Sequence, residues 1–340
     1  MSAYVILIIV VALGFNFMNG FHDAANAIAT VIATRVLSPL KAVIWAAAFD
    51  FIAAIMAVKF SAKVADTVGK IVNVDAFASL QGEMYHILFA ALIGAIAWEV
   101  ITWFLGLPVS ASHALIGALA GSGLTAAGIH LHSLTNILNW EKIEMTALFI
   151  VLSPLIGLIL GYIIMVLILN IFRGVSPSRI DKSFRVAQIL SAGAYSLGHG
   201  ANDAQKTMGI IALVYCGFKM PEHIPAWIGY ACAATIALGT MSGGWKVIKT
   251  MGMGITKLKP VSAFAAESAG AIAILFATFL GIPVSTTHTI TGAIMGVGAT
   301  HRSRAVRWGV AGRIVWAWII TMPAAALMSA AVYGVTTLFA

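Results

Sequence analysis

One peptide occurs twice in this chain, and that repetition constrains the fold more than any other feature. Residues 106–121 read GLPVSASHALIGALAG and residues 281–296 read GIPVSTTHTITGAIMG, with eight of sixteen positions identical. A second pair lies upstream, NGFHDAANAIA at 19–29 and HGANDAQKTMG at 199–209. The pairs are offset by 175 and 180 residues and keep the same order, so the sequence predicts a duplicated unit.

Long apolar segments fill most of both copies. The 340 residues are 61% hydrophobic and only 9% charged, whereas a soluble domain carries about 25% charged residues. Each segment is long enough, or nearly so, to cross a hydrocarbon core of about 30 Å as a helix. The ten segments are 3–34, 40–60, 84–105, 108–128, 145–172, 186–217, 224–242, 260–280, 283–300 and 306–338. Because no alternating barrel-type pattern occurs, we expect an all-α polytopic membrane protein in a lipid bilayer.

The segment count predicts how the two copies sit in the membrane. Some segments are too long for one straight span, so we expect ten to twelve spans with broken helices or hairpins. Each copy holds five segments, and an odd number makes the second copy enter upside down. Inverted repeats of this kind are typical of secondary transporters. We predict a first repeat over 1–173, a basic cytoplasmic linker over 174–185 and a second repeat over 186–340.

Basic residues gather in alternate connections. The connections after the first, fifth, seventh and ninth segments carry a clear excess of Lys and Arg, including Arg35, Arg173, Arg302 and Arg304. The positive-inside rule then puts these connections in the cytoplasm and both termini on the external side of the inner membrane. It also puts the 106–108 connection inside and the 281–283 connection outside. These loops account for the net charge of +8, so we expect no nucleic-acid partner.

The repeated GxPVS peptide predicts an anion site. Gly-X-Pro ends one helix, and the residues after it then begin the next helix, where free N–H groups carry partial positive charge. Helix starts of this kind bind phosphate, sulfate and carboxylate. Two copies meeting near the midplane would form a cage of donors for an oxyanion. The candidate substrate-binding residues here are Ser110, Ala111, Ser112, Ser285, Thr286 and Thr287. The alternative is that these hydroxyls only cap their helices.

The other repeated peptide carries acids inside apolar segments. Asp23 and Asp203 each follow a Gly, where we expect the helix to be unwound, and intramembrane carboxylates are functional candidates by default. With Asn26 nearby, the acids suit Na⁺, whereas a dry carboxylate could instead carry a proton. Asn202 and Thr207 join the candidate substrate-binding set. A purely structural alternative is a buried pair between Asp203 and the lysine at 206.

Other intramembrane groups are weaker candidates. We take Asp50 and Glu267 as coupling-ion residues and leave Glu99 as a helix–helix contact. His22 and His199 flank the acids and could sense protons. We expect His113 and His288 to orient helices, since no partner ligand stands at metal-site spacing.

An oxyanion cage beside paired acids predicts cation-coupled symport. Each net charge moved against about 100 mV costs about 2.3 kcal/mol, so anion uptake needs co-transported positive charge. The alternatives are a sulfate permease, which would use a similar cage, and an anion channel, which would not need the acids. Neither GxSxG nor HExxH occurs, so we expect no enzyme and no bound cofactor.

The order GFHDAANAIAT, PVSASH, GHGANDAQKTMGI, PVSTTH resembles the inorganic phosphate transporter (PiT) family. LGTMSGGWKVIKTMG at 238–252 and AFAAESAGA at 263–271 are also similar to that family. The resemblance implies a symporter of inorganic phosphate with H⁺ or Na⁺, usually a homodimer. It also implies that Asp23 and Asp203 are the essential acids, with Ser110, Ser285 and Glu267 as matching site residues.

The chain departs from many members of that family at a few positions. His22 stands where they have an amide, Asp50 where they have Glu, and Gln205-Lys206 where they have Ala-Asn. These features resemble the bacterial low-affinity branch, which implies proton coupling and phosphate taken as a neutral complex with a divalent metal. A Na⁺ site formed by Asp23, Asn26 and Asp203 is the alternative.

Overall fold

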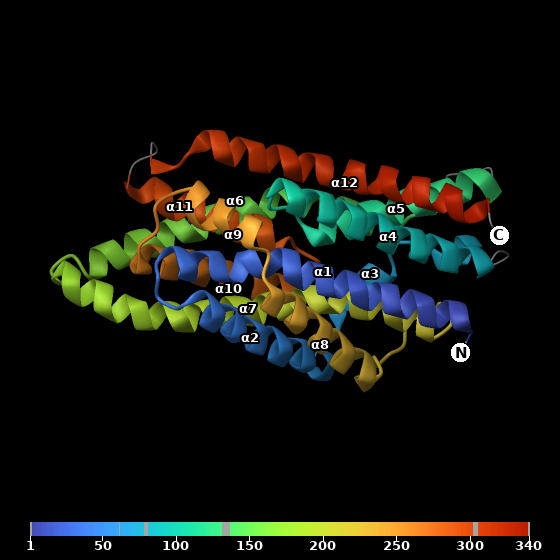
Figure 1. Ribbon diagram of the computed structural model, residues 1–340, viewed down its shortest axis with the longest axis horizontal. Coiled ribbons are helices and arrows are strands. Elements are labelled where there is room, and N and C mark those ends of the chain that lie inside the picture. Colours follow the sequence, from blue (N-terminus) through green and yellow to red (C-terminus); the bar gives the residue numbers. More distant parts are fainter. Residues whose placement is uncertain (1, 61, 78–80, 131–136, 302–304, 339–340) are drawn as a thin grey trace.

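The computed structural model describes residues 2–60, 62–77, 81–130, 137–301 and 305–338, and these residues form helices without a named strand (Figure 1). The long helices are α1 (Ala3–Ala33), α2 (Pro39–Phe60), α4 (Gln81–Leu105), α5 (Ala111–His130), α6 (Trp140–Ile171), α7 (Pro177–Tyr215), α8 (Ala226–Ser242), α10 (Pro260–Leu280), α11 (Thr286–His301) and α12 (Trp308–Thr337). Three short ones are α3 (Lys63–Gly69), the 3₁₀ turn η1 (Val74–Phe77) and α9 (Trp245–Gly254).

The ten predicted segments match the ten long helices closely. Seven of the described helices, namely α1, α2, α4, α5, α6, α10 and α12, are both long and apolar enough to cross a membrane. The helix α8 has 17 residues and α11 has 16, and α7 carries more polar residues than a simple span. The prediction of an all-α polytopic membrane protein is confirmed.

The two GxPVS connections touch each other inside the protein. Ser112 donates a hydrogen bond to the Val284 carbonyl, and Thr287 donates one to the Val109 carbonyl. In Figure 1, α4 and α5 lie in the half of the bundle that holds both termini, and α10 and α11 lie in the other half. Each pair is therefore a hairpin whose tip reaches the middle of the bundle. The prediction that the two connections lie on opposite membrane faces was wrong, because their charge-free tips are buried together.

Left-handed glycines form the two tips. Gly106 has φ of 65° and Gly281 has φ of 77°, values that side chains rarely adopt. Each glycine ends its first helix, and the following Pro opens the turn into the second. The repeated Gly-X-Pro thus builds the same hairpin tip twice.

Helix packing in the two halves corresponds pair by pair. The helices α1 and α4 pack together, and so do their counterparts α7 and α10. Likewise α5 packs against α12, and its counterpart α11 packs against α6, the counterpart of α12. The GxxxG glycines form these last contacts, because a Cβ on Gly117 would lie 2.4 Å from the Met322 carbonyl oxygen and one on Gly292 would lie 2.0 Å from that of Pro154. This correspondence agrees with the duplication, while the inverted relation and the division at 173 and 186 stay predictions.

The helices that carry the two acids are not unwound. The helix α1 runs without a break through Asp23, and α7 runs through Asp203. The glycines before the acids serve packing instead: a Cβ on Gly20 would lie 2.3 Å from the Ile236 carbonyl oxygen, and one on Gly200 would lie 2.5 Å from the Asp50 Cα. The expectation of unwound helices was wrong, since these glycines let helices cross closely.

Both chain ends lie at the same end of the bundle, and the α1–α2 and α6–α7 connections lie at the other (Figure 1). This arrangement agrees with the prediction that the termini share one side and that basic connections share the opposite side. Arg302 and Arg304 lie outside the described residues. The membrane orientation stays a prediction.

Candidate functional site

Two helix N-termini meet where the hairpin tips touch. The Ser112 bond to Val284 is 3.1 Å and the Thr287 bond to Val109 is 3.0 Å, and these four residues are equivalent across the repeat. Each tip therefore uses the third residue after Val to hold the other tip. The free N–H groups at the starts of α5 and α11 are brought close together by this exchange.

Ser110 and Ser285 cap the two helices. The Ser110 hydroxyl oxygen accepts from the His113 N–H at 3.3 Å, and the Ser285 oxygen accepts from the His288 N–H at 3.1 Å. The capping role that the sequence offered as an alternative is thus present. Among the described residues neither hydroxyl hydrogen has an acceptor, so both remain available to donate to an anion. Ala111 is buried at the first turn of α5.

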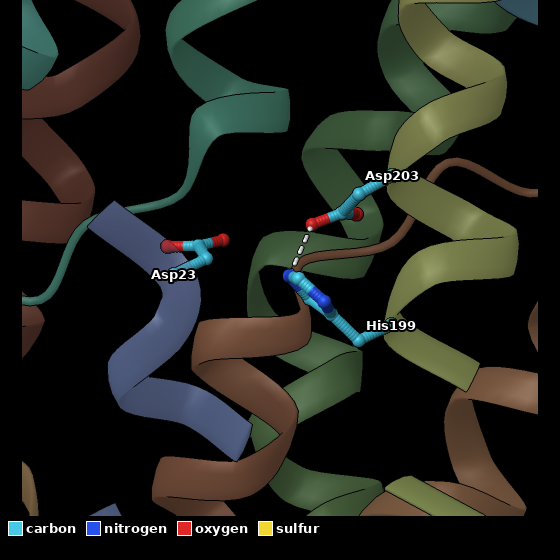
Figure 2. A group of neighbouring side chains, drawn as sticks. All are labelled: Asp23, His199 and Asp203. Atoms are coloured by element: carbon cyan, nitrogen blue, oxygen red, sulfur yellow. Dashed lines mark ion pairs between the residues drawn. The ribbon is translucent and has the colours of Figure 1, made fainter. Parts of the chain in front are cut away.

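Buried acids from two helices lie beside the second tip. Figure 2 shows Asp23 on α1 and His199 with Asp203 on α7, and their ligand atoms all lie within 4.8 Å of one another. The His199 Nε2 is 3.2 Å from an Asp203 oxygen, and its Nδ1 is 2.9 Å from an oxygen of Asp50. Asp50, which also accepts from Thr240 at 2.7 Å, is thus joined to Asp203 through one imidazole.

The hydroxyls of α11 connect these acids to the anion cage. The Thr286 hydroxyl lies 3.4 Å from oxygens of both Asp23 and Asp203. Thr287 lies 3.3 Å from Asp23 and receives a 2.9 Å hydrogen bond from Asn26. A change of charge at the acids therefore acts directly on residues at the start of α11.

Lys206 connects the acids to the first tip. Its ammonium forms a buried ion pair with Asp203, bonds to the Ser112 hydroxyl and donates to the Val284 carbonyl at 3.2 Å. The Asp203–Lys206 pair that the sequence offered as a structural alternative is therefore present. Because the same lysine reaches both tips, it also places a positive charge beside the cage.

Other predicted site residues lie elsewhere. Glu267 accepts from Gln188 at 3.0 Å and from Ser191. Asn202 donates to Thr278 at 2.9 Å and to the carbonyl before the second-tip Pro, so it holds the hairpin rather than an acid. Thr207 is buried, and its hydroxyl has no partner among the described residues. These placements leave the site-residue assignments as predictions.

The side chains at the site offer oxygen ligands for a hard cation beside Asp23 but not beside Asp203. The Asn26 side-chain oxygen is buried without a partner in the described residues, and with the Asp23 carboxylate it offers the oxygens that Na⁺ prefers. Asp203 is already paired with an ammonium and an imidazole, which compete with a metal for its oxygens. The arrangement accommodates a Na⁺ or a proton, and a second cation would have to displace Lys206.

Sequence reasoning gave little weight to two residues that prove central. His199 and Lys206 stand four residues before and three residues after Asp203, spacings that put all three on one face of a helix. That spacing was visible in the sequence. The Asp50–His199 contact spans 149 positions and left no local signal.

Known proteins of one family resemble this chain along its whole length. Residues 19–329 match the model of the phosphate transporter family. A probable low-affinity inorganic phosphate transporter of Rhizobium meliloti is 50% identical over 338 residues, covering 98% of this chain and 96% of that protein. One of the same description from Bacillus subtilis is 43% identical, covering 96% of each. A solved structure of a sodium-dependent phosphate transporter superposes with a TM-score of 0.89 at 27% identity, covering all of both chains. The chain belongs to the phosphate transporter family.

Proposed function

We propose that this protein imports inorganic phosphate by symport with a cation, H⁺ or Na⁺, through alternating access. One observation carries the proposal: two opposed helix N-termini meet beside the buried pair of Asp23 and Asp203. An anion site and a cation site in contact are what symport of an anion requires. The descriptions of the relatives support phosphate as the anion.

The anion is held by uncharged donors and one fixed cation. Backbone N–H groups of α5 and α11 and the hydroxyls of Ser110 and Ser285 supply donors suited to a tetrahedral oxyanion. The ammonium of Lys206 adds positive charge next to them. Ser112, Thr286 and Thr287 complete the cage in this proposal.

Coupling follows from the shared hydroxyls. With the acids ionised and no cation bound, phosphate would meet negative charge one hydroxyl away, through Thr286. A cation on Asp23 removes that repulsion, so anion and cation bind best together. The same pairing reduces the net charge that crosses the membrane potential, at about 2.3 kcal/mol per charge per 100 mV.

The alternatives have less support. No relative reported above is described as a sulfate permease, so the sulfate alternative is not supported. A channel would not need buried acids beside its anion site. The family and relatives are transporters, which points away from an enzyme. A homodimer, an inner-membrane location and a divalent metal–phosphate substrate stay predictions.

Radiolabelled phosphate uptake into liposomes that hold the purified protein tests the proposal. We would impose a Na⁺ gradient or a pH gradient, add excess sulfate in one arm, and add a chelator of divalent metals in another. Uptake that one gradient drives and sulfate leaves unchanged is expected. Uptake that ignores both gradients would indicate a channel, and uptake blocked by sulfate would indicate a sulfate permease. Loss of uptake with the chelator would identify the metal complex as the substrate.

A further inference from the structure

Five carboxyl side chains are buried in the described residues, and one of them differs from the rest. Asp23 and Asp203 contact hydroxyls and basic groups, Asp50 contacts His199 and Thr240, and Glu267 accepts from Gln188 and Ser191. Glu99 on α4 is 0% exposed, and neither of its oxygens has a hydrogen-bond partner in the part of the chain described. Packing alone does not account for a carboxyl group in such a place.

The free-energy cost of burying a charge decides whether the Glu99 carboxyl group is ionised or protonated in this structure. An ionised carboxylate without a hydrogen bond or counterion is strongly disfavoured in a low-dielectric interior. Protonation removes most of that cost. A bound metal would also remove it, but a hard cation needs several oxygen ligands, and the group of acids and histidine that lie close together in the described residues does not include Glu99. A proton needs no further ligand, so it suits this isolated carboxyl group better than a metal ion does.

The surroundings of Glu99 give such a proton an effect on the substrate site. On α1, His22 lies 3.2 Å from Asp23 and 3.4 Å from the hydroxyl of Thr102, which is one turn after Glu99 and donates to the Glu99 carbonyl. The nearby charges that act on Glu99 are Asp23, Asp203 and Lys206, two negative and one positive.

The remaining elements packed on α4 contribute little charge, and η1 among them supplies only the exposed Asp75. The helix α5 supplies His113, a buried imidazole with no hydrogen-bond partner among the described residues, and α9 supplies Lys246, whose ammonium lies 4.9 Å from the Trp103 ring centroid. The buried face of α12 holds no carboxylate, Lys, Arg or His, and its one phenol, Tyr333, donates to Glu83 near the start of α4. Ionisation of Glu99 would therefore add a third negative charge near the two site acids.

We propose that Glu99 is a proton-binding residue of the transport cycle, taking up a proton with phosphate and releasing it on the other side. The inference rests on the proposed function and identifies H⁺ as a coupling ion. Release requires a state in which Glu99 meets water or a base. Exchange of external for internal phosphate needs no release, because the proton can stay in place through both half-cycles.

Proteoliposomes with Glu99→Gln, Glu99→Asp and a matched surface control, Glu144→Gln, test this role. Three quantities would be measured: accumulation driven by a pH gradient, acidification of the interior on adding phosphate, and phosphate exchange at equal pH. We expect Glu99→Gln to exchange phosphate at the wild-type rate but to accumulate none and to cause no acidification. Glu99→Asp and the exposed Glu144→Gln should retain all three.

The outcomes separate this inference from the proposed function. Coupled accumulation and acidification at wild-type level in Glu99→Gln would overturn it. Wild-type uptake driven by Na⁺ with no proton movement would overturn it as well, while leaving cation-coupled phosphate import intact. Wild-type liposomes that take up no phosphate under any gradient would overturn both. If Glu99→Gln does not fold, infrared spectroscopy of the C=O stretching band of protonated carboxylic acids replaces it. The frequency of that band should differ between the wild type and Glu99→Asp, and an unchanged frequency would contradict the proposal.

Discussion

The helices α1 and α7, which carry Asp23 and Asp203, are equivalent in the two repeats but differ in the charge around the acid. Aligned on their acids, α1 has Asn19, His22 and Asn26 around Asp23, and α7 has His199, Asn202 and Lys206 around Asp203. Histidine and asparagine have exchanged places, and asparagine has become lysine. The helix, the glycine and the acid are common to both copies, whereas the groups that neutralise the acid are not.

This difference separates the roles of the two halves. Asp203 is held by the chain's own ammonium and by His199, so it keeps its charge without an external cation. Asp23 has His22 and two threonine hydroxyls, none of which is permanently positive. Glu99, in the same half, has no partner in the described residues. We therefore expect the exchangeable cation to act on the first half and the fixed cation to hold the second.

The largest effect is expected from neutralising each acid. Asp23→Asn and Asp203→Asn should both abolish coupled phosphate uptake in liposomes. Their stabilities should differ, because Asp203→Asn leaves the ammonium of Lys206 buried without its partner, at a cost of about 3–5 kcal/mol. Asp23→Asn strands no fixed charge. Thermal unfolding in detergent measures the difference. Equal melting temperatures would contradict the claim that only Asp203 has a fixed buried cation, and coupled uptake at the wild-type rate in either variant would contradict the role of that acid.

Lys206→Asn would place in α7 the residue type that α1 has at the equivalent position, Asn26. Asp203 would then lack its fixed cation, and we expect it to require one from solution. The dependence of the uptake rate on cation concentration should become steeper, because two exchangeable cations would be needed. Asp203→Asn/Lys206→Asn serves as the control: removing both charges should destabilise less than the sum of the single changes. An unchanged cation dependence in Lys206→Asn would show that Lys206 does not neutralise Asp203.

Ser110→Ala and Ser285→Ala compare the two halves at the anion cage. Each change removes one hydrogen bond to a charged group, which is worth about 1.5–3 kcal/mol of phosphate affinity. Each also removes a helix cap worth about 1 kcal/mol of stability. Phosphate binding by calorimetry separates these effects from unfolding. Equal losses of affinity would mean that the halves share the anion, and an unchanged affinity would remove that serine from the cage.

The sequence predicted the helices well, and it predicted hairpins without showing which segments form them. Ten apolar segments stand out because lipid demands them, and they match the ten long helices. The arms of a hairpin are as apolar and as long as full spans, so α4 and α5 look like two crossings. Only the bonds between the tips, which join residues 172 and 178 positions apart, show otherwise.

At the site, the sequence showed which polar side chains are costly to bury but not which groups they contact. Asp23, Asp203 and the paired hydroxyls could be chosen because polar groups are expensive in apolar segments. The glycines before the acids gave a wrong result, because a glycine permits close packing as readily as unwinding. Glu99 was undervalued, since the lack of a partner is a property of the folded interior alone.

The smallest effect is expected at an exposed pair with nearly the same helical spacing as the buried one. Lys70 and Asp66 lie 2.8 Å apart on the protein surface, and their side chains are 53% and 49% exposed. Water already solvates both charges, so Asp66→Asn should cost about 0.2–1 kcal/mol and less at high salt. Asp66→Asn, measured in the same melting assay as Asp203→Asn, gives the loss of stability when an acid is removed from a solvated ion pair. A similar cost for the two variants would mean that water reaches Asp203 and Lys206, and that the second half carries no fixed internal cation.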